Sequence, residues 1–91
     1  MPIFLLSCAL RAPGRNYEPL WRALEQAKAV QALDSSWFVE SEQGAADLNR
    51  KMLAHLGPDD GLLILEIRSE SRWAATRLGG KAGEWLKKRR P

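Results

Sequence analysis

Two short apolar runs constrain the fold of this chain more than any other feature. The first spans residues 2–9 and the second spans residues 62–67. Each is too short for an independent helix and is bounded by turn residues, which is typical of strands buried on both faces. Amphipathic segments lie between the two runs. A chain of 91 residues with this alternation is expected to form one domain that mixes strands and helices.

Two amphipathic helices are predicted between these strands. Asn16 can cap the first, whose apolar residues recur at 3.6-residue spacing and which should end near Lys28. The second should run from Gly44 to Leu56, because Gly57-Pro58 supplies a left-handed cap and then a residue that cannot continue a helix.

The remaining segments are less regular. Residues Val30 to Ser41 are rich in strand formers and predict either one bent strand or a tight hairpin; sequence does not separate the two. Residues 73–78 can form a short edge strand, and residues 82–89 can form about two turns of helix after Gly79-Gly80.

The order of strands and helices is what a ferredoxin-like sandwich requires. We therefore expect an α/β fold of the α+β type, an antiparallel sheet with two helices on one face. Residues 1–78 would form this domain and residues 79–91 a short basic C-terminal extension.

Charge is unevenly distributed along the chain. Residues 1–71 carry seven basic and ten acidic side chains, a net of −3, whereas residues 72–91 carry seven basic side chains against Glu84 alone, a net of +6. Clustered cations raise the local potential that attracts phosphate backbones. A solvated tail that only aids solubility is the alternative.

The cysteine count and the N-terminal residues bear on the cellular compartment, on metal binding and on membrane association. Cys8 is the single cysteine, so no intrachain disulfide forms and a reducing cytoplasm is expected. One cysteine and one histidine, His55, cannot supply a zinc site of the usual ligand count, and we expect neither metal nor cofactor. The apolar N-terminus has no basic region before it and is too short to span a membrane, so no membrane association is expected.

The segment after the first apolar run carries a family resemblance. Leu10-Arg11-Ala12-Pro13-Gly14-Arg15-Asn16-Tyr17-Glu18-Pro19-Leu20 resembles the SinR-like family, whose first strand leads into Leu-Arg-x-Pro-Gly-x-x-Tyr-x-x-Leu. Residues 33–39 resemble that family's second-strand signature, and residues 62–67 fit its last core strand after an Asp-Asp turn. The resemblance covers roughly residues 2–75 and extends to the CRISPR-associated spacer-integration subunit and to VapD-type ribonucleases.

This resemblance implies a ferredoxin-like dimer, in a group whose members bind nucleic acid or cleave it with a metal ion. The group's carboxylate stands at the end of the first strand in a Tyr-Asp pair, where this chain has Cys8-Ala9. Ala9 cannot hold a metal ion, and metal-dependent hydrolysis needs converging carboxylates. Asp34, Glu40 and Glu66 each stand alone on their elements. We therefore expect no enzyme activity and assign no catalytic or metal-binding residue.

Two sets of residues are candidates for phosphate binding. Arg11 and Arg15 flank Pro13-Gly14 just before a helix N-terminus, where guanidinium groups and free N–H groups can hold an anion, and Tyr17 can stack or hydrogen-bond beside them. A surface loop whose arginines pair with acids is an equal alternative.

The second set is the basic tail with its interleaved tryptophans Trp73 and Trp85. Its members are Arg72, Arg77, Lys81, Lys87, Lys88, Arg89 and Arg90. Cations beside aromatic rings suit single-stranded nucleic acid, whose bases stack while its backbone meets charge. Packing of these tryptophans on the body or across a dimer is the favoured alternative for the rings.

The sequence thus predicts a non-catalytic, nucleic-acid-binding homodimer that contacts DNA or RNA through phosphates. Two alternatives stay open. One is a metal-dependent endoribonuclease with relocated ligands. The other is a protein-interaction module, such as an antitoxin, inhibitor or assembly subunit, whose basic tail docks on an acidic protein partner.

Overall fold

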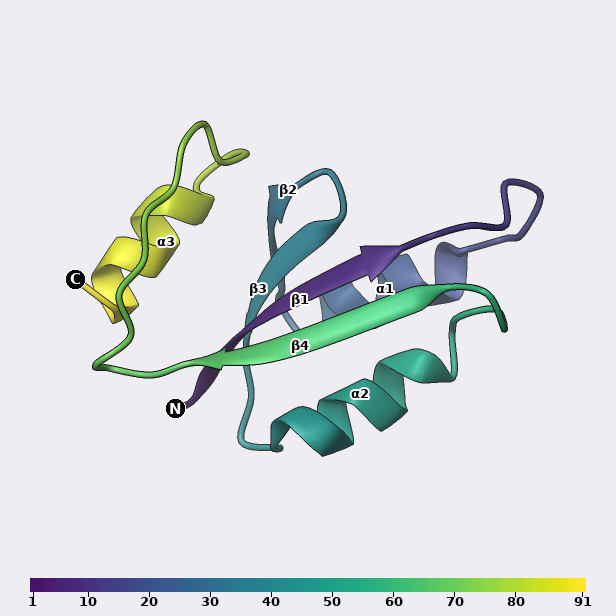
Figure 1. The fold of residues 1–91 in the computed structure, drawn as a ribbon, viewed down its shortest axis with the longest axis horizontal. Helices are drawn as coiled ribbons and strands as arrows, with labels where there is room; N and C mark the ends of the chain where they lie inside the picture. The colour runs from purple at the N-terminus through teal and green to yellow at the C-terminus, as the bar shows by residue number, and fades with distance from the viewer.

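Four strands and three helices follow one another in a mixed order. The computed structural model describes residues 1–91, and the elements are β1 (Ile3–Ala9), α1 (Glu18–Gln26), β2 (Val30–Leu33), β3 (Ser36–Glu40), α2 (Ala45–Leu53), β4 (Gly61–Ile67) and α3 (Ala82–Arg89). The strands form one antiparallel sheet in the order β2-β3-β1-β4 (Figure 1). The chain is therefore an α+β domain.

Strand β1 lies at the centre of the sheet and pairs on both sides. Leu5 is opposite Phe38 of β3 and Leu65 of β4, so the two neighbours extend the sheet in opposite directions. The region between α1 and α2 is a tight hairpin, because β2 and β3 pair antiparallel across a turn at residues 34–35. This settles the alternative left open by the sequence.

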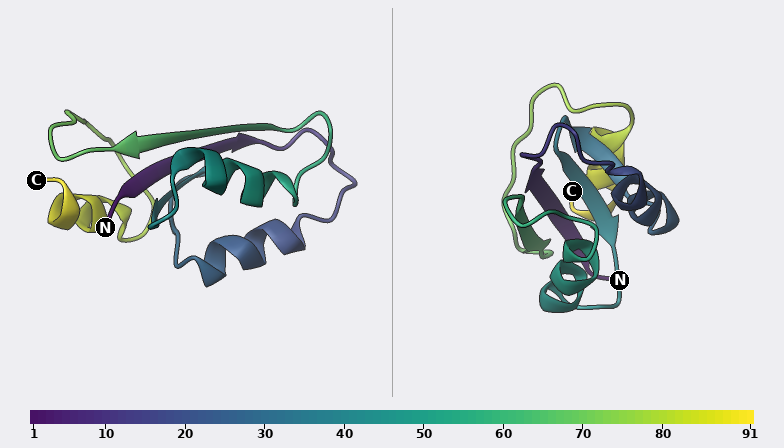
Figure 2. Two further views of the ribbon diagram at one scale, coloured as in Figure 1. Left: turned by 90° about the horizontal axis from the view of Figure 1, so that it is seen from below. Right: turned by 90° about the vertical axis from the view of Figure 1, so that its right-hand side faces the viewer.

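Helices α1 and α2 cover one face of the sheet (Figure 2). Alternate side chains of β1 point to this face, and Leu6 packs in one buried cluster with Leu20 of α1 and Met52 of α2. The sequence predicts Asn16 as the cap of α1, whereas the N-cap position is Tyr17 and no side chain caps the helix. The Asn16 side-chain oxygen instead accepts a hydrogen bond from the Glu18 N–H at 3.0 Å, which forms a turn immediately before the helix.

Helix α3 packs on the opposite face at one end of the sheet. Ala82 and Leu86 are buried there against Ile3 and Phe38, and the Trp85 ring stacks on Phe38 with centroids 5.8 Å apart. The last helix is thus part of the hydrophobic core. Beyond α3 this face stays partly open, because no helix covers the middle of β1 and β4 (Figure 2). Residues 71–76 and Leu78 border a hollow there together with Leu5 and Leu65.

Three expectations are wrong in detail. Helix α2 ends at Leu53 with its cap at Ala54 in the right-handed region, and not at Leu56 with a left-handed Gly57. Strand β4 was expected to be buried on both faces, yet it forms an edge of the sheet, and Leu63 and Leu65 are 55% and 51% exposed on the open face. Residues 73–78 form no strand. Arg77 has a φ of 53°, in the left-handed region, which ends the extended course of this segment, and only the Gly79 N–H reaches the β2 edge, donating to the Ala32 carbonyl.

The packing of α3 yields a stability prediction. Leu86 is only 2% exposed, so Leu86→Ala should lower the free energy of unfolding by about 2–5 kcal/mol through lost burial and a cavity. Urea denaturation measures this change. Lys88→Ala, an exposed substitution on the same helix, is the control and should change stability by less than about 0.5 kcal/mol. Equal effects of the two variants would contradict the docking of α3.

Candidate nucleic-acid interface

Asp60 fastens the loop after β1 to the turn before β4. Its carboxylate accepts hydrogen bonds from the Arg11 N–H at 2.7 Å, the Gly57 N–H at 2.7 Å and the Tyr17 hydroxyl at 2.9 Å. Two of the three donors, Arg11 and Tyr17, lie more than 40 residues before Asp60, so this carboxylate joins two segments that are distant in sequence. The first predicted phosphate site therefore surrounds an acidic side chain.

The two loop arginines are directed to backbone carbonyls. The Arg11 guanidinium donates to the Asp59 carbonyl at 2.7 Å, and the Arg15 guanidinium donates to the Leu56 carbonyl at 3.3 Å. Neither forms an ion pair. Both side chains therefore join the loop to the segment between α2 and β4.

The first turn of α1 has no free donor for an anion. The Glu18 N–H is bound by Asn16, and Pro19 has none. The Leu20 and Trp21 N–H groups both donate to the Tyr17 carbonyl, at 2.9 and 3.1 Å. The geometry thus favours the alternative of a structural surface loop over that of a phosphate cradle.

The ionisation of this cluster follows from its hydrogen bonds. The Arg11 and Gly57 N–H groups hold the pKa of Asp60 below its usual value, with a smaller contribution from the Tyr17 hydroxyl. Burial and the bond to Asp60 raise the pKa of Tyr17. Burial also raises the pKa of Cys8, and the negative charge of Asp60 adds to this. Cys8 is accordingly a neutral core thiol and not an activated nucleophile.

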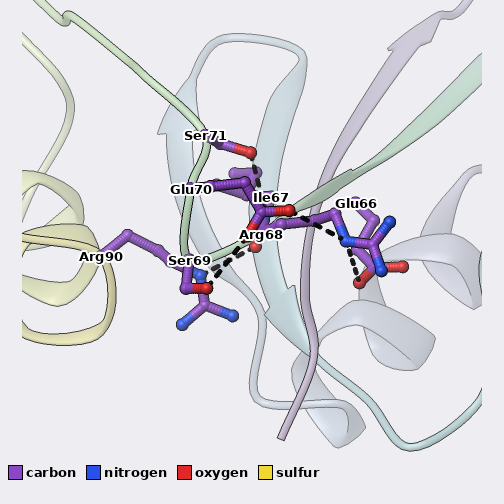
Figure 3. Close-up of polar contacts among 7 residues, drawn as sticks. All are labelled: Glu66, Ile67, Arg68, Ser69, Glu70, Ser71 and Arg90. Carbon is purple, nitrogen blue, oxygen red and sulfur yellow. Dashed lines mark hydrogen bonds and ion pairs between the residues drawn. The ribbon is translucent and has the colours of Figure 1, made fainter.

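At the C-terminus, Arg89 and Arg90 hold α3 to the sheet. The Arg89 guanidinium lies 3.0 Å from the Glu40 carboxylate and 4.0 Å from the Trp85 ring centroid. Arg90 Nε donates to the Ile67 carbonyl at 2.8 Å (Figure 3). Two of the seven predicted tail cations are therefore used within the fold.

A turn after β4 directs the chain toward the tail. The Ser71 hydroxyl accepts from the Arg68 N–H at 2.9 Å, while the Arg68 side chain lies between Glu66 and Glu70 at 3.9 and 3.5 Å (Figure 3). The backbone N–H of Glu70 and the Ser69 hydroxyl lower the pKa of the Glu70 carboxyl. This turn ends immediately before Arg72.

The structure gathers part of the basic tail around Trp73. One hollow of about 520 Å³ is lined by Arg72, Trp73 and Lys87, together with Ser71 and Pro91. A second hollow, of about 340 Å³, is lined by Trp73, Lys87 and Arg77 together with Glu84, Leu78, Ala75 and two glycines. The two hollows share Trp73 and Lys87. We call Arg72, Trp73, Arg77 and Lys87 the Trp73 patch.

The cations of the Trp73 patch are exposed and form no ion pair. Lys81 and Lys88 are likewise exposed and unpaired, with Lys81 beside Arg77 in a hollow at the β2 edge. The Trp73 indole N–H donates to the Arg90 carbonyl at 2.8 Å, which fixes the half-buried ring. Sequence reasoning named these cations but missed the fixed ring geometry and the role of Asp60. No local sequence pattern indicates these two features. Trp73 and Arg90 are 17 residues apart, and Tyr17 and Asp60 are 43 residues apart.

Comparisons of the chain with protein-family models, curated proteins and solved structures found no match. No group of three or more His, Cys, Asp or Glu side chains lies close enough together to hold a metal ion. None of the helices has the length and apolar character needed to cross a membrane.

The Asp60 cluster predicts a pH dependence of stability. Because the pKa of Asp60 is lower in the folded than in the unfolded chain, its stabilising effect is present above the unfolded value of about 3.8 and is lost as the pH falls through the folded value. Wild type should thus exceed Asp60→Asn in stability at pH 6, and the gap should shrink below pH 4. Urea unfolding across this range measures it.

Asp59→Asn is the matched control for that experiment, because the Asp59 side chain makes no hydrogen bond or ion pair. Its stability should follow that of wild type at every pH. A stability difference for Asp60→Asn that is unchanged between pH 6 and pH 3 would contradict the assigned hydrogen bonds.

Proposed function

We propose that this chain is a non-catalytic module that binds single-stranded nucleic acid, DNA or RNA, at the Trp73 patch. The observation that carries the proposal is the meeting of unpaired cations with a fixed aromatic ring in two adjoining hollows. Bases stack on an aromatic face whatever their sequence, and the backbone is held by charge. Binding of this kind needs no catalytic group.

The fixed ring favours binding in a second way. Because the Arg90 carbonyl already holds the Trp73 indole, stacking a base on this ring costs little additional side-chain entropy. Arg72 and Lys87 border the same hollow as the ring, within reach of the phosphates on either side of a stacked base. Arg77 extends the positive surface into the second hollow. Lys81 and Lys88 are further exposed cations on this part of the chain.

The proposal includes a ferredoxin-like fold related to the SinR-like family. The connectivity β1-α1-β2-β3-α2-β4 with sheet order β2-β3-β1-β4 supports it, as does the placement of α1 and α2 on one face. The single buried cysteine supports a reducing, cytoplasmic setting.

A matched pair of double variants tests the binding site. Arg72→Gln with Lys87→Gln removes two cations from the Trp73 patch, whereas Arg22→Gln with Lys51→Gln removes two exposed cations from α1 and α2. Each lost phosphate contact should reduce the slope of log K against log salt by about 0.7 for a single strand. We expect the first variant to bind a labelled oligonucleotide more weakly and with a slope flatter by about 1.4, in fluorescence anisotropy titrations at several salt concentrations.

The control variant has the same net charge and should bind as wild type does. Equal weakening of both variants would show only a general charge effect and would contradict the site. Trp73→Leu separates stacking from charge: it should cost about 1–3 kcal/mol in affinity with the salt slope unchanged. Absence of binding by wild type to any single strand would overturn the proposal. Strand cleavage with Mg²⁺ that EDTA abolishes would favour the endoribonuclease alternative.

A further inference from the structure

The outer edge of β4 presents unpaired backbone groups. On β1, Cys8 N–H donates to the Ser35 carbonyl and the Pro2 carbonyl accepts from Ser41, so the even-numbered residues of β1 bond toward β3. In an antiparallel sheet the odd-numbered residues then bond toward β4, where their partners are also odd-numbered. The even-numbered residues of β4 therefore point their N–H and C=O groups away from the sheet. These are Leu62, Ile64 and Glu66.

The outward N–H groups beyond these three are already occupied. The Asp60 N–H donates to the Gly57 carbonyl, and the Arg68 N–H donates to the Ser71 hydroxyl (Figure 3). The free edge is thus a defined stretch between two capped positions. It contains no proline and no bulge. Such an edge is a template for pairing with another strand.

We propose that a second copy of this chain pairs with β4 as an antiparallel strand, with the two-fold axis at Ile64. In this register Ile64 faces its own counterpart and Leu62 faces Glu66 of the second copy. Each facing pair exchanges two backbone hydrogen bonds, which gives six across the interface. The two sheets then join into one of eight strands.

Charge selects this register over its neighbours. With the axis at Ile64, Arg68 stands opposite Asp60 of the second copy, and no like charges face each other directly. Moving the axis to Leu63 sets Asp60 opposite Glu66, and moving it to Leu65 sets Asp60 opposite Glu70. Like charges directly opposite destabilise a strand pair, whereas opposite charges stabilise it.

Apolar side chains agree with the same register. Leu63 and Leu65 are more than half exposed in the single chain, and pairing about Ile64 sets each opposite the other in the second copy. These are non-hydrogen-bonded positions, where side chains of facing strands approach most closely. The interface therefore covers two of the largest exposed apolar side chains in each copy. This inference does not rest on nucleic-acid binding.

Disulfide trapping tests the register. In a Cys8→Ala background, a tagged chain carrying Leu63→Cys is mixed with an untagged chain carrying Leu65→Cys and oxidised. We expect the mixed 63–65 disulfide to form in large excess over the 63–63 and 65–65 products, whose Cα atoms are about 7–8 Å apart in this register, beyond disulfide reach. No cross-link, or a dominant 63–63 or 65–65 product, would overturn the register.

The oligomeric state provides a second, independent measurement. By analytical ultracentrifugation wild type should dimerise, and Leu63→Lys with Leu65→Lys should weaken the dimer at least tenfold. Leu33→Lys is the control, because Leu33 is 52% exposed on β2 at the other edge of the sheet, and it should leave the dimer intact. Circular dichroism checks that all variants fold. A wild type that stays monomeric up to about 1 mM, the weak end of specific association, would overturn the proposal, as would an equal loss in the control.

Discussion

The pairing of β1 on both of its edges organises the whole molecule. Because side chains alternate along a strand, this central strand divides its residues between two faces. Phe4 and Leu6 enter the core beneath α1 and α2, and Ile3 faces α3. The helix-covered face forms the larger buried cluster. The other face is covered by α3 and by Trp73 and Leu78 of the segment before it, while Leu63 and Leu65 stay exposed.

Local sequence signals predicted most of the elements but not their surroundings. The 3.6-residue spacing of apolar side chains predicted both helices, because it depends only on residues within a few turns of each other. Their ends were predicted less well: α1 is capped at Tyr17 and not at Asn16, and α2 ends at Leu53, before Gly57-Pro58. The apolar run of β4 predicted a strand correctly. It did not predict an edge position, because a run of leucines and isoleucines cannot reveal whether another element covers the second face.

The candidate site was likewise predicted only in part from the sequence. The cations of the tail were evident from charge alone, but their division into two groups was not. Arg89 reaches Glu40 across 49 residues, and Arg90 reaches Ile67 across 23, so only the folded chain separates these structural arginines from the exposed Arg72 and Lys87. The loop arginines show the converse. Their spacing suggested an anion site, but the Arg11 and Arg15 guanidinium groups donate to backbone carbonyls, and the Arg11 N–H donates to Asp60.

The central claim is that single strands contact the Trp73 patch and not the loop at Arg11 to Tyr17. Photocrosslinking of a single-stranded oligonucleotide that carries 5-iodouracil, followed by peptide mapping, tests this most directly because it locates the contact without any substitution. We expect the cross-linked peptide to contain Trp73, whose ring lines the same hollow as Arg72 and Lys87. Cross-links confined to residues 11–17, or none at all, would contradict it.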